Sequence, residues 1–301
     1  MWNTLSLKFN NEIVMKTVSH KLRNHQNKIL TLILIMGFLS KIFGQSEPKT
    51  EYQSDWTFYF SNVNDKLSSI ATDLNLTSIA PIKGQENVVY VSIKMTNPKE
   101  NGLSSNEDAD ELWKIQNEII SRFDKKNLNY TFAGRLTSDG YRDLYFFGED
   151  TILMENVVSS SMTVFPNYQF DFGHKPDKKW SGYFDFLYPL PRQMQIIQNR
   201  RVLEQLEKGG DNLTKEREVF HWIYFKAQKE LDQFESFTKS LGFKTLNKGK
   251  TEQPNEYKFM ISVSRVDKVG YDDINDYTLE LWLKASDLNG DYDGWETSIE
   301  K

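Results

Sequence analysis

The segment NYTFAGRLTSDGYRDLYFF, from Asn129 to Phe147, decides the fold. Its two halves carry apolar, aromatic and β-branched residues in the short runs typical of strands, and the tetrapeptide TSDG between them ends at Gly140. Glycine accepts the positive φ that a tight hairpin turn requires. We therefore predict two antiparallel strands, Asn129 to Leu136 and Tyr141 to Phe147, joined by this turn.

A strand and a helix are expected on each side of this hairpin. Ahead of it, VVYVSIKM (Val88 to Met95) clusters apolar residues as a strand does, and Ser105 with Asp108 forms a capping box that starts a helix. Beyond it, a short helix follows Glu149, and an alternating strand ends near Phe172. The order strand, helix, strand, strand, helix, strand predicts a ferredoxin-like, split βαβ layer with its helices on one face.

The second half of the chain repeats this order. Strands are expected at Val219 to Lys226 (VFHWIYFK), near Phe243 and at Tyr257 to Val266, and the helix between the first two ends at Gly242. A last helix and strand follow, at Thr278 to Ala285 and at Tyr292 to Ile299. This half therefore also reads as ferredoxin-like.

Two further features concern the limits of the halves. DWTFYF, from Asp55 to Phe60, is an additional strand ahead of the first unit. Pro189 and Pro191 break regular structure between the halves, so we place the domain boundary near Pro191.

Residues 1–44 have the features of a secretory signal peptide. Basic residues precede an apolar run from Ile29 to Leu39, which is only about half of the roughly 20 residues that span a bilayer, so no permanent membrane span is expected. We expect cleavage near Gly44 and Gln45, from a true start at Met15, and hence an exported protein of the periplasm or the cell exterior. The predicted fold class is α+β, with two ferredoxin-like domains in tandem after a signal peptide.

Composition argues against several classes of function. The chain of 301 residues is 39% hydrophobic and 14% aromatic, which is enough for packed cores. Outside residues 1–44, 31 basic and 41 acidic residues remain, and such a surface repels phosphate backbones, so no direct binding of nucleic acid is expected. The absence of cysteine excludes disulfides, thiol nucleophiles and a lipid anchor on cysteine.

No cofactor or metal site is expected. Only His174 and His221 lie beyond the leader, and no glycine-rich phosphate loop, HExxH or GxSxG pattern occurs. The segment NGDYDGWETSIE, from Asn289 to Glu300, has the spacing of an EF-hand calcium loop, but Glu296 stands where an apolar residue is usual. We expect a polar turn followed by an edge strand there.

The C-terminal region resembles a known family through one short motif. Tyr292, Asp293, Gly294 and Trp295 spell YDGW, after a βαββ run and a helix. Residues 199–301 thereby resemble the regulator of ribonuclease activity B family. The resemblance implies a ferredoxin-like fold and a protein partner, since bacterial members bind and inhibit the endoribonuclease that initiates messenger-RNA decay. It makes Tyr292, Asp293 and Trp295 candidate binding residues.

Residues 52–190 resemble a second family, the domain of unknown function 695. The resemblance is carried by GRLTSDGYRDLYFF (Gly134 to Phe147), by KKWSGYFDFLYP (Lys178 to Pro189) and by a helix start from Gly102 to Glu107. It implies no activity. The two families are known to occur fused in this order, which supports both resemblances.

Four charged residues cluster at the hairpin turn, namely Arg135, Asp139, Arg142 and Asp143. Two arginines on adjoining strands can clamp a carboxylate or a phosphate. Opposite charges on adjoining strands also pair with each other. We expect ion pairs of the arginines with Asp139 or Asp143, and the clamp is the alternative.

Two other groups of residues have a structural and a functional interpretation. Trp180 opens an aromatic run that extends to Tyr188 and either lines a ligand platform or packs on the sheet, and we expect packing. His221 shares a strand face with Val219 and Ile223, and no Ser, Asp or second His is spaced to form a triad with it. We therefore expect a hydrogen-bonded sheet residue and assign no catalytic residue.

These observations predict an exported, non-catalytic binding or regulatory protein, ribonuclease-inhibitor-like in its C-terminal half. The leader conflicts with a direct transfer of the inhibitor role, because that nuclease works on the cytoplasmic side of the membrane. Two alternatives stay open: a cell-envelope hydrolase built on an acid pair or on the region of Arg135 and Arg142, and a small-ligand-binding protein that uses the run at Trp180.

Overall fold

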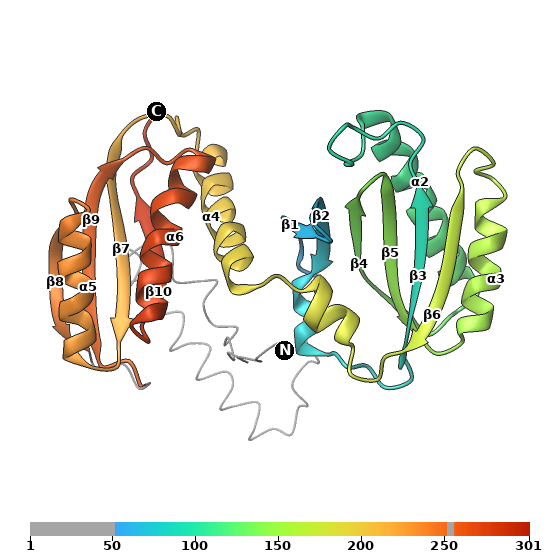
Figure 1. The fold of residues 1–301 in the computed structure, drawn as a ribbon, viewed down its shortest axis with the longest axis horizontal. Helices are drawn as coiled ribbons and strands as arrows, with labels where there is room; N and C mark the ends of the chain where they lie inside the picture. Colours follow the sequence, from blue (N-terminus) through green and yellow to red (C-terminus); the bar gives the residue numbers. More distant parts are fainter. Residues whose placement is uncertain (1–51, 252–255) are drawn as a thin grey trace, which may run out of the picture. The chain divides into compact units, whose positions relative to one another are not determined.

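The computed structural model describes residues 52–251 and 256–301. They form two compact units that divide between Gln198 and Asn199. Each unit is α+β and is built on one antiparallel sheet (Figure 1). Across the described ranges, no helix is long and apolar enough to cross a membrane. The predicted leader and its cleavage site lie outside the described residues.

The first unit contains six strands, four helical segments and a single sheet. The strands are β1 (Trp56–Val63), β2 (Lys66–Asp73), β3 (Asn87–Lys94), β4 (Tyr130–Ser138), β5 (Tyr141–Gly148) and β6 (Phe170–Pro176). The helical segments are η2 (Leu74–Ser78), α2 (Asn106–Lys125), α3 (Thr151–Met162) and the π-helix η3 (Gly182–Leu187). The strands lie in the order β1-β2-β4-β5-β3-β6.

The predicted hairpin is confirmed as β4 and β5. Asp139 and Gly140 form its turn with φ of 48° and 83°, the left-handed pair that matches the twist of the flanking strands. The predicted order of elements is confirmed by β3, α2, β4, β5, α3 and β6. Ser105 caps α2, because its side chain accepts a hydrogen bond from the backbone N–H of Asp108.

The first sheet extends further than predicted. The strand expected at Asp55 to Phe60 is β1, and it pairs along its whole length with β2, a strand that we did not predict. The sequence of β2, KLSSIATD, has one strongly β-forming aliphatic residue among small and polar ones, so its local strand signal is weak. β2 is held in strand conformation by its pairing with β1 and β4, and not by the strand propensity of its own residues.

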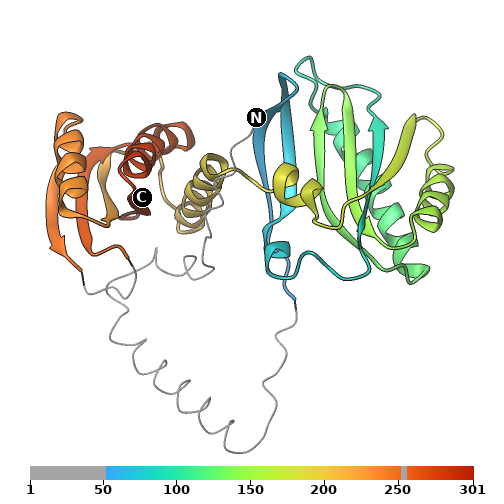
Figure 2. The ribbon, with the colours of Figure 1, turned by 60° about the horizontal axis from the view of Figure 1, so that its bottom comes forward.

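The sheet of the first unit is covered on both faces (Figures 1 and 2). Helices α2 and α3 pack on one face over a core that includes Val91, Leu112 and Val158. The segment that contains η3 packs on the other face, where the ring of Trp180 stacks on Phe147 with centroids 4.0 Å apart. The predicted packing of the aromatic run is therefore confirmed.

The second unit has four strands and three helices. The strands are β7 (Arg217–Phe225), β8 (Lys244–Lys250), β9 (Phe259–Asp267) and β10 (Asp291–Thr297), in the order β10-β7-β9-β8. The helices are α4 (Pro191–Lys208), α5 (Gln228–Ser240) and α6 (Tyr271–Asp287). The predicted edge strand is confirmed as β10. Helix α6 begins seven residues earlier than expected, because its acidic first turn gives no apolar periodicity from which a helix start could be predicted. Helix α4 begins at Pro191, near which we placed the boundary, whereas the units divide between Gln198 and Asn199, within α4. The residues of α4 before Asn199 therefore belong to the first unit.

Candidate functional site

Arg135 and Arg142 lie on the same face of the first sheet, beneath α2. The guanidinium carbon of Arg135 lies 4.2 Å from the centre of the Trp113 ring, and Nη1 donates to Gln116 Oε1 at 3.3 Å. Trp113 and Gln116 are both residues of α2. Arg142 Nε donates to Thr137 Oγ1 at 2.9 Å, across the β4–β5 pair. The two strands and the helix thus bring two positive charges together.

The expected ion pairs of these arginines are not formed. Asp139 pairs with Lys66 at 3.4 Å, and Asp143 accepts a hydrogen bond from Ser92 Oγ at 2.6 Å. Asp143 follows Arg142 directly in a strand, so its side chain points to the opposite face of the sheet. Within the described ranges, no carboxylate lies within 4.0 Å of either guanidinium. The prediction of cross-strand ion pairs was therefore wrong.

Arg142 is a buried cation with an unused hydrogen-bond donor. The residue is only 6% exposed, and its Nη1 has no hydrogen-bond partner in the described part of the chain. Its Nη2 lies 3.5 Å from Ser104 Oγ, at the limit of a hydrogen bond. Burial, followed by the charge of Arg135, lowers the pKa of Arg142 to about 10, against the opposing effect of the Asp108 carboxylate. Burial also lowers the pKa of Arg135.

The loop before α2 is held against the hairpin turn by glycine. The backbone N–H of Gly140 donates to the carbonyl of Gly102 at 3.0 Å. Gly102 has φ of 80°, and a Cβ there would lie 2.8 Å from the backbone nitrogen of Asp139, so no other residue fits without movement. This contact fixes the loop that carries Ser104 beside Arg142.

Exposed aromatic residues continue this face toward the edge of the sheet. In strand register, Phe58 lies beside Ala71, which lies beside Arg135. One row further on, Phe60 lies beside Ser69. We call the set of Trp56, Phe58, Phe60, Trp113, Arg135 and Arg142 the aromatic–arginine face.

Two rings of the aromatic–arginine face, those of Phe60 and Trp113, are accessible to a ligand. Phe60 is 54% exposed and Trp113 is 43% exposed. Trp56 stacks on Phe132 with centroids 5.2 Å apart, which fixes the end of the row nearest the core. The alternation in DWTFYF predicted a strand, but the signal for a binding surface was that its outward positions are aromatic instead of polar.

Trp180 does not contribute to this face. It is fully buried on the opposite side of the sheet, and its Nε1 donates to the carbonyl of Gln85 at 2.8 Å. Its role in the structure is to hold the loop before β3 against the sheet.

The YDGW motif of the second unit lies mostly inside the protein. Tyr292 Oη and His221 Nδ1 are 2.8 Å apart, and Trp295 Nε1 donates to Asn199 Oδ1 at 3.1 Å. Tyr292 and Trp295 are both buried, whereas Asp293 is partly exposed. His221 is a hydrogen-bonded sheet residue, as expected, and Tyr292 and Trp295 anchor β10 to the core.

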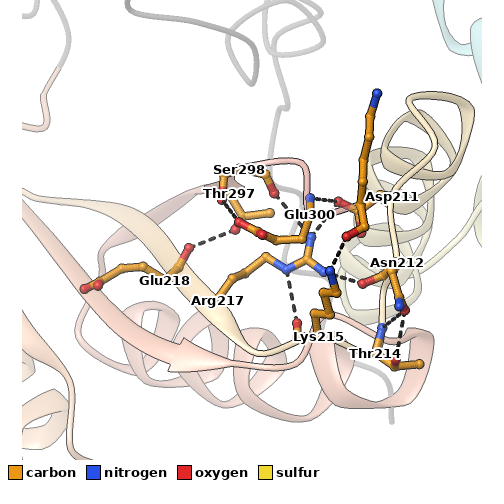
Figure 3. Close-up of polar contacts among 10 residues, drawn as sticks. Asp211, Asn212, Thr214, Lys215, Arg217, Glu218, Thr297, Ser298 and Glu300 are labelled. Carbon is orange, nitrogen blue, oxygen red and sulfur yellow. Dashed lines mark hydrogen bonds and ion pairs between the residues drawn. The ribbon is translucent and has the colours of Figure 1, made fainter.

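A buried ion pair near the end of the second unit gave no signal in the sequence. Arg217 Nη1 lies 2.5 Å from Asp211 Oδ2, and the same carboxylate oxygen accepts from the backbone N–H of Glu300 at 2.8 Å (Figure 3). The guanidinium also donates to backbone carbonyls of Asn212, Lys215 and Ser298. Because its donors are used, we interpret Arg217 as a structural link between the loop after α4 and the segment after β10.

Several carboxylates of the second unit gather at one hollow. A hollow of about 400 Å³ in the second unit is lined by several acids, among them Asp273, Asp276 and Glu280. Burial raises the pKa of Asp143 and of Asp291, but these two residues belong to different units and neither lines the hollow. Within residues 52–251 and 256–301, no group of three or more His, Cys, Asp or Glu could hold a metal ion.

Two family models match the chain. Residues 54–188 match the model of a family of unknown function, DUF695, and residues 196–297 match the model of the regulator of ribonuclease activity B. Both resemblances inferred from short motifs are thereby confirmed. The second match ends at Thr297, the last residue of β10.

Likeness to solved structures is low. The crystal structure of a candidate glycine cleavage system transcriptional repressor shares 10% identity at a TM-score of 0.23 and covers 71% of this chain and 98% of that chain. The crystal structure of an unknown protein from Galdieria sulphuraria shares 10% identity at a TM-score of 0.19, over 71% and 99%. Neither carries an argument about fold or function. No curated protein matches the sequence.

Proposed function

We propose that this chain, in which a DUF695 domain is followed by a regulator of ribonuclease activity B domain, is an exported, non-catalytic protein that binds a protein partner. The first domain receives an anionic group of that partner at Arg135 and Arg142. The second domain supplies the regulator-like protein contact that its family name suggests. Both domains are ferredoxin-like in this proposal, which the central position of the first and third strands of each βαββαβ unit supports.

The observation that carries the proposal is the state of Arg142. A buried guanidinium without a carboxylate costs free energy, and its free Nη1 leaves one donor unused. An anion that accepts from both arginines would use that donor and compensate both charges. A buried guanidinium that has no carboxylate beside it is therefore a candidate binding group.

The anion site is tested with a simple probe. Arginine Nε–H signals are followed by NMR while acetate is added, with acetamide at matched ionic strength as the neutral control. We expect the signals of Arg135 and Arg142 to shift with acetate alone, and Arg135→Gln to abolish the shift of the Arg142 signal. Arg122→Gln is the matched control, since Arg122 is already paired with Glu118 at 2.5 Å. Equal responses to acetate and acetamide would remove the basis for an anion site.

The proposed export rests on the basic and apolar segments of residues 1–44. Tagged full-length protein is purified from fractionated native cells, and its N-terminus and co-purifying proteins are identified by mass spectrometry. An N-terminus at Gln45 with a stoichiometric envelope partner is the expected result. An intact leader together with a cytoplasmic nuclease would overturn export and favour a ribonuclease regulator.

A further inference from the structure

The aromatic side chains of β1 form a straight row on one face of the sheet. Trp56, Phe58 and Phe60 alternate with Thr57 and Tyr59, which point to the other face and are buried. Residues two apart in a strand are separated by about 6.6 Å, so the row extends for about 13 Å along β1. A row of this length matches about four residues of an extended chain and exceeds the size of a single amino acid.

The strand register sets this row beside the arginines. Two strand spacings of about 4.8 Å separate β1 from β4, so Phe58 lies about 10 Å from Arg135 across the sheet. Directly between them, β2 places the small residues Ala71 and Ser69, while Leu67 and Asp73 share this face toward the ends of β2. The guanidinium of Arg135 lies against Trp113 and Gln116 of α2, so a glutamate or aspartate side chain of the ligand has to extend from the row to meet it.

The charges on this face call for an acidic partner. Arg135 is stacked on Trp113, and Arg142 on the neighbouring strand is buried. Neither has a carboxylate partner in the described ranges. A carboxylate is a planar, two-oxygen acceptor and therefore matches the donors of guanidinium groups. A ligand that meets both parts of the face has an apolar ring for the row and a carboxylate for the arginines.

We propose that the aromatic–arginine face binds an extended peptide segment of the protein partner in which an aromatic residue stands two positions from an aspartate or glutamate. This inference rests on the proposed function and names its ligand. Side chains two positions apart in an extended peptide point to the same side, so one segment presents ring and carboxylate together. Exposed ring stacking on Phe60 supplies affinity, and the arginines supply the charge specificity.

The test uses three short peptides whose only charge is the glutamate side chain, when present. The probes are N-acetyl-Trp-Ala-Glu amide, N-acetyl-Ala-Ala-Glu amide and N-acetyl-Trp-Ala-Gln amide, titrated by calorimetry into the full chain. We expect the first peptide to bind about tenfold more tightly than either of the others, since an aromatic pair and a charged hydrogen bond each contribute at this level.

Two variants test whether the affinity gained from tryptophan and from glutamate arises at the aromatic–arginine face. Phe60→Ser should remove the advantage of the tryptophan peptide over the alanine peptide and leave the alanine peptide unaffected. Arg135→Gln should remove the advantage of glutamate over glutamine. Ile152→Ser is the matched control, because Ile152 is also an exposed apolar residue, at 69%, but lies on α3.

The outcomes separate this inference from the proposed function. If acetate shifts the arginine signals while tryptophan adds no affinity, the anion site stands and the peptide inference fails. If free indole propionate binds as tightly as the tryptophan peptide, the ligand is a small aromatic acid and the inference is overturned. If neither acetate nor any peptide acts on Arg135 and Arg142, the proposed function fails as well.

Discussion

Arg217 and Asp211 form an ion pair with 2.5 Å between Nη1 and Oδ2, although their side chains are only 2% and 0% exposed. Removing one partner of a buried pair leaves the other charge uncompensated, at a cost of about 3–5 kcal/mol. We therefore expect Arg217→Met to lower the free energy of unfolding of the second unit by about that amount in chemical denaturation. Lys114→Met is the control, because Lys114 belongs to an exposed pair with Glu111 and should leave stability nearly unchanged. Equal stability of the two variants would contradict a structural role for Arg217.

Gly102→Ala tests the contact between the loop before α2 and the hairpin turn. Gly102 and Gly210 have nearly the same φ, 80° and 79°, but a Cβ on Gly102 would lie less than 3.0 Å from backbone atoms, whereas a Cβ on Gly210 would meet open space. Gly210→Ala should cost about 1 kcal/mol for the left-handed conformation alone. Gly102→Ala should cost clearly more, because it also displaces Asp139, and thermal unfolding of both variants measures the difference. Similar melting temperatures would show that the loop moves freely.

His221 should make the stability of the second unit dependent on pH. Burial, followed by the charge of Arg265, lowers the pKa of His221 to about 3. The folded state therefore holds a neutral imidazole, whereas the unfolded chain binds a proton below its ordinary pKa of about 6.5. The contribution of His221 is complete above that pH and is lost as pH falls toward 3, by up to about 1.4 kcal/mol per pH unit.

The measurement compares wild type with His221→Gln at neutral pH and at about pH 4.5. Wild type should lose about 2–3 kcal/mol more free energy of unfolding than the variant over this interval. Carboxylates that titrate in the same interval are present in both proteins and cancel in the comparison. Parallel pH profiles would mean that His221 is protonated in the folded protein.

Arg142→Met should behave in the opposite way to Arg217→Met. The buried guanidinium of Arg142 has no carboxylate and one unused donor, so an apolar side chain of similar length removes an uncompensated charge. We expect the free energy of unfolding to stay the same or to rise, while acetate no longer shifts the Arg135 signal. A loss of several kcal/mol would instead assign Arg142 a structural role through Thr137 and Ser104.

Local signals predicted the elements of the fold well. The turn at Gly140, the cap at Ser105 and the apolar runs of the central strands each have a nearby physical cause, and each was confirmed. β2 was missed because its order comes from pairing with β1 and β4 and not from its own residues. The sequence therefore predicted the elements that are stabilised by their own residues, and missed the strand that depends on its partners.

Two residues of the candidate site were named from the sequence, but their contacts and the aromatic residues of the face were not. Arg135 and Arg142 were identified, yet their partners were assigned by proximity in the sequence. The alternation of strand side chains already separates Arg142 from Asp143, and this rule was the available signal. The stacking of Arg135 on Trp113 depends on how α2 packs on the sheet, which sequence spacing does not reveal.

The pairing of β10 with β7 has a consequence for the speed of folding. Tyr292 and His221 are 71 positions apart in the sequence, whereas the hairpin of β4 and β5 closes over a two-residue turn. Closing a long loop costs entropy before any contact is gained, so sheets built from distant segments form slowly. In the first domain, the central strands β4 and β5 form a short-range pair, whereas β7, a central strand of the second domain, pairs with the distant segments β9 and β10. In stopped-flow refolding, the second domain should therefore be the slower of the two to reach its native state.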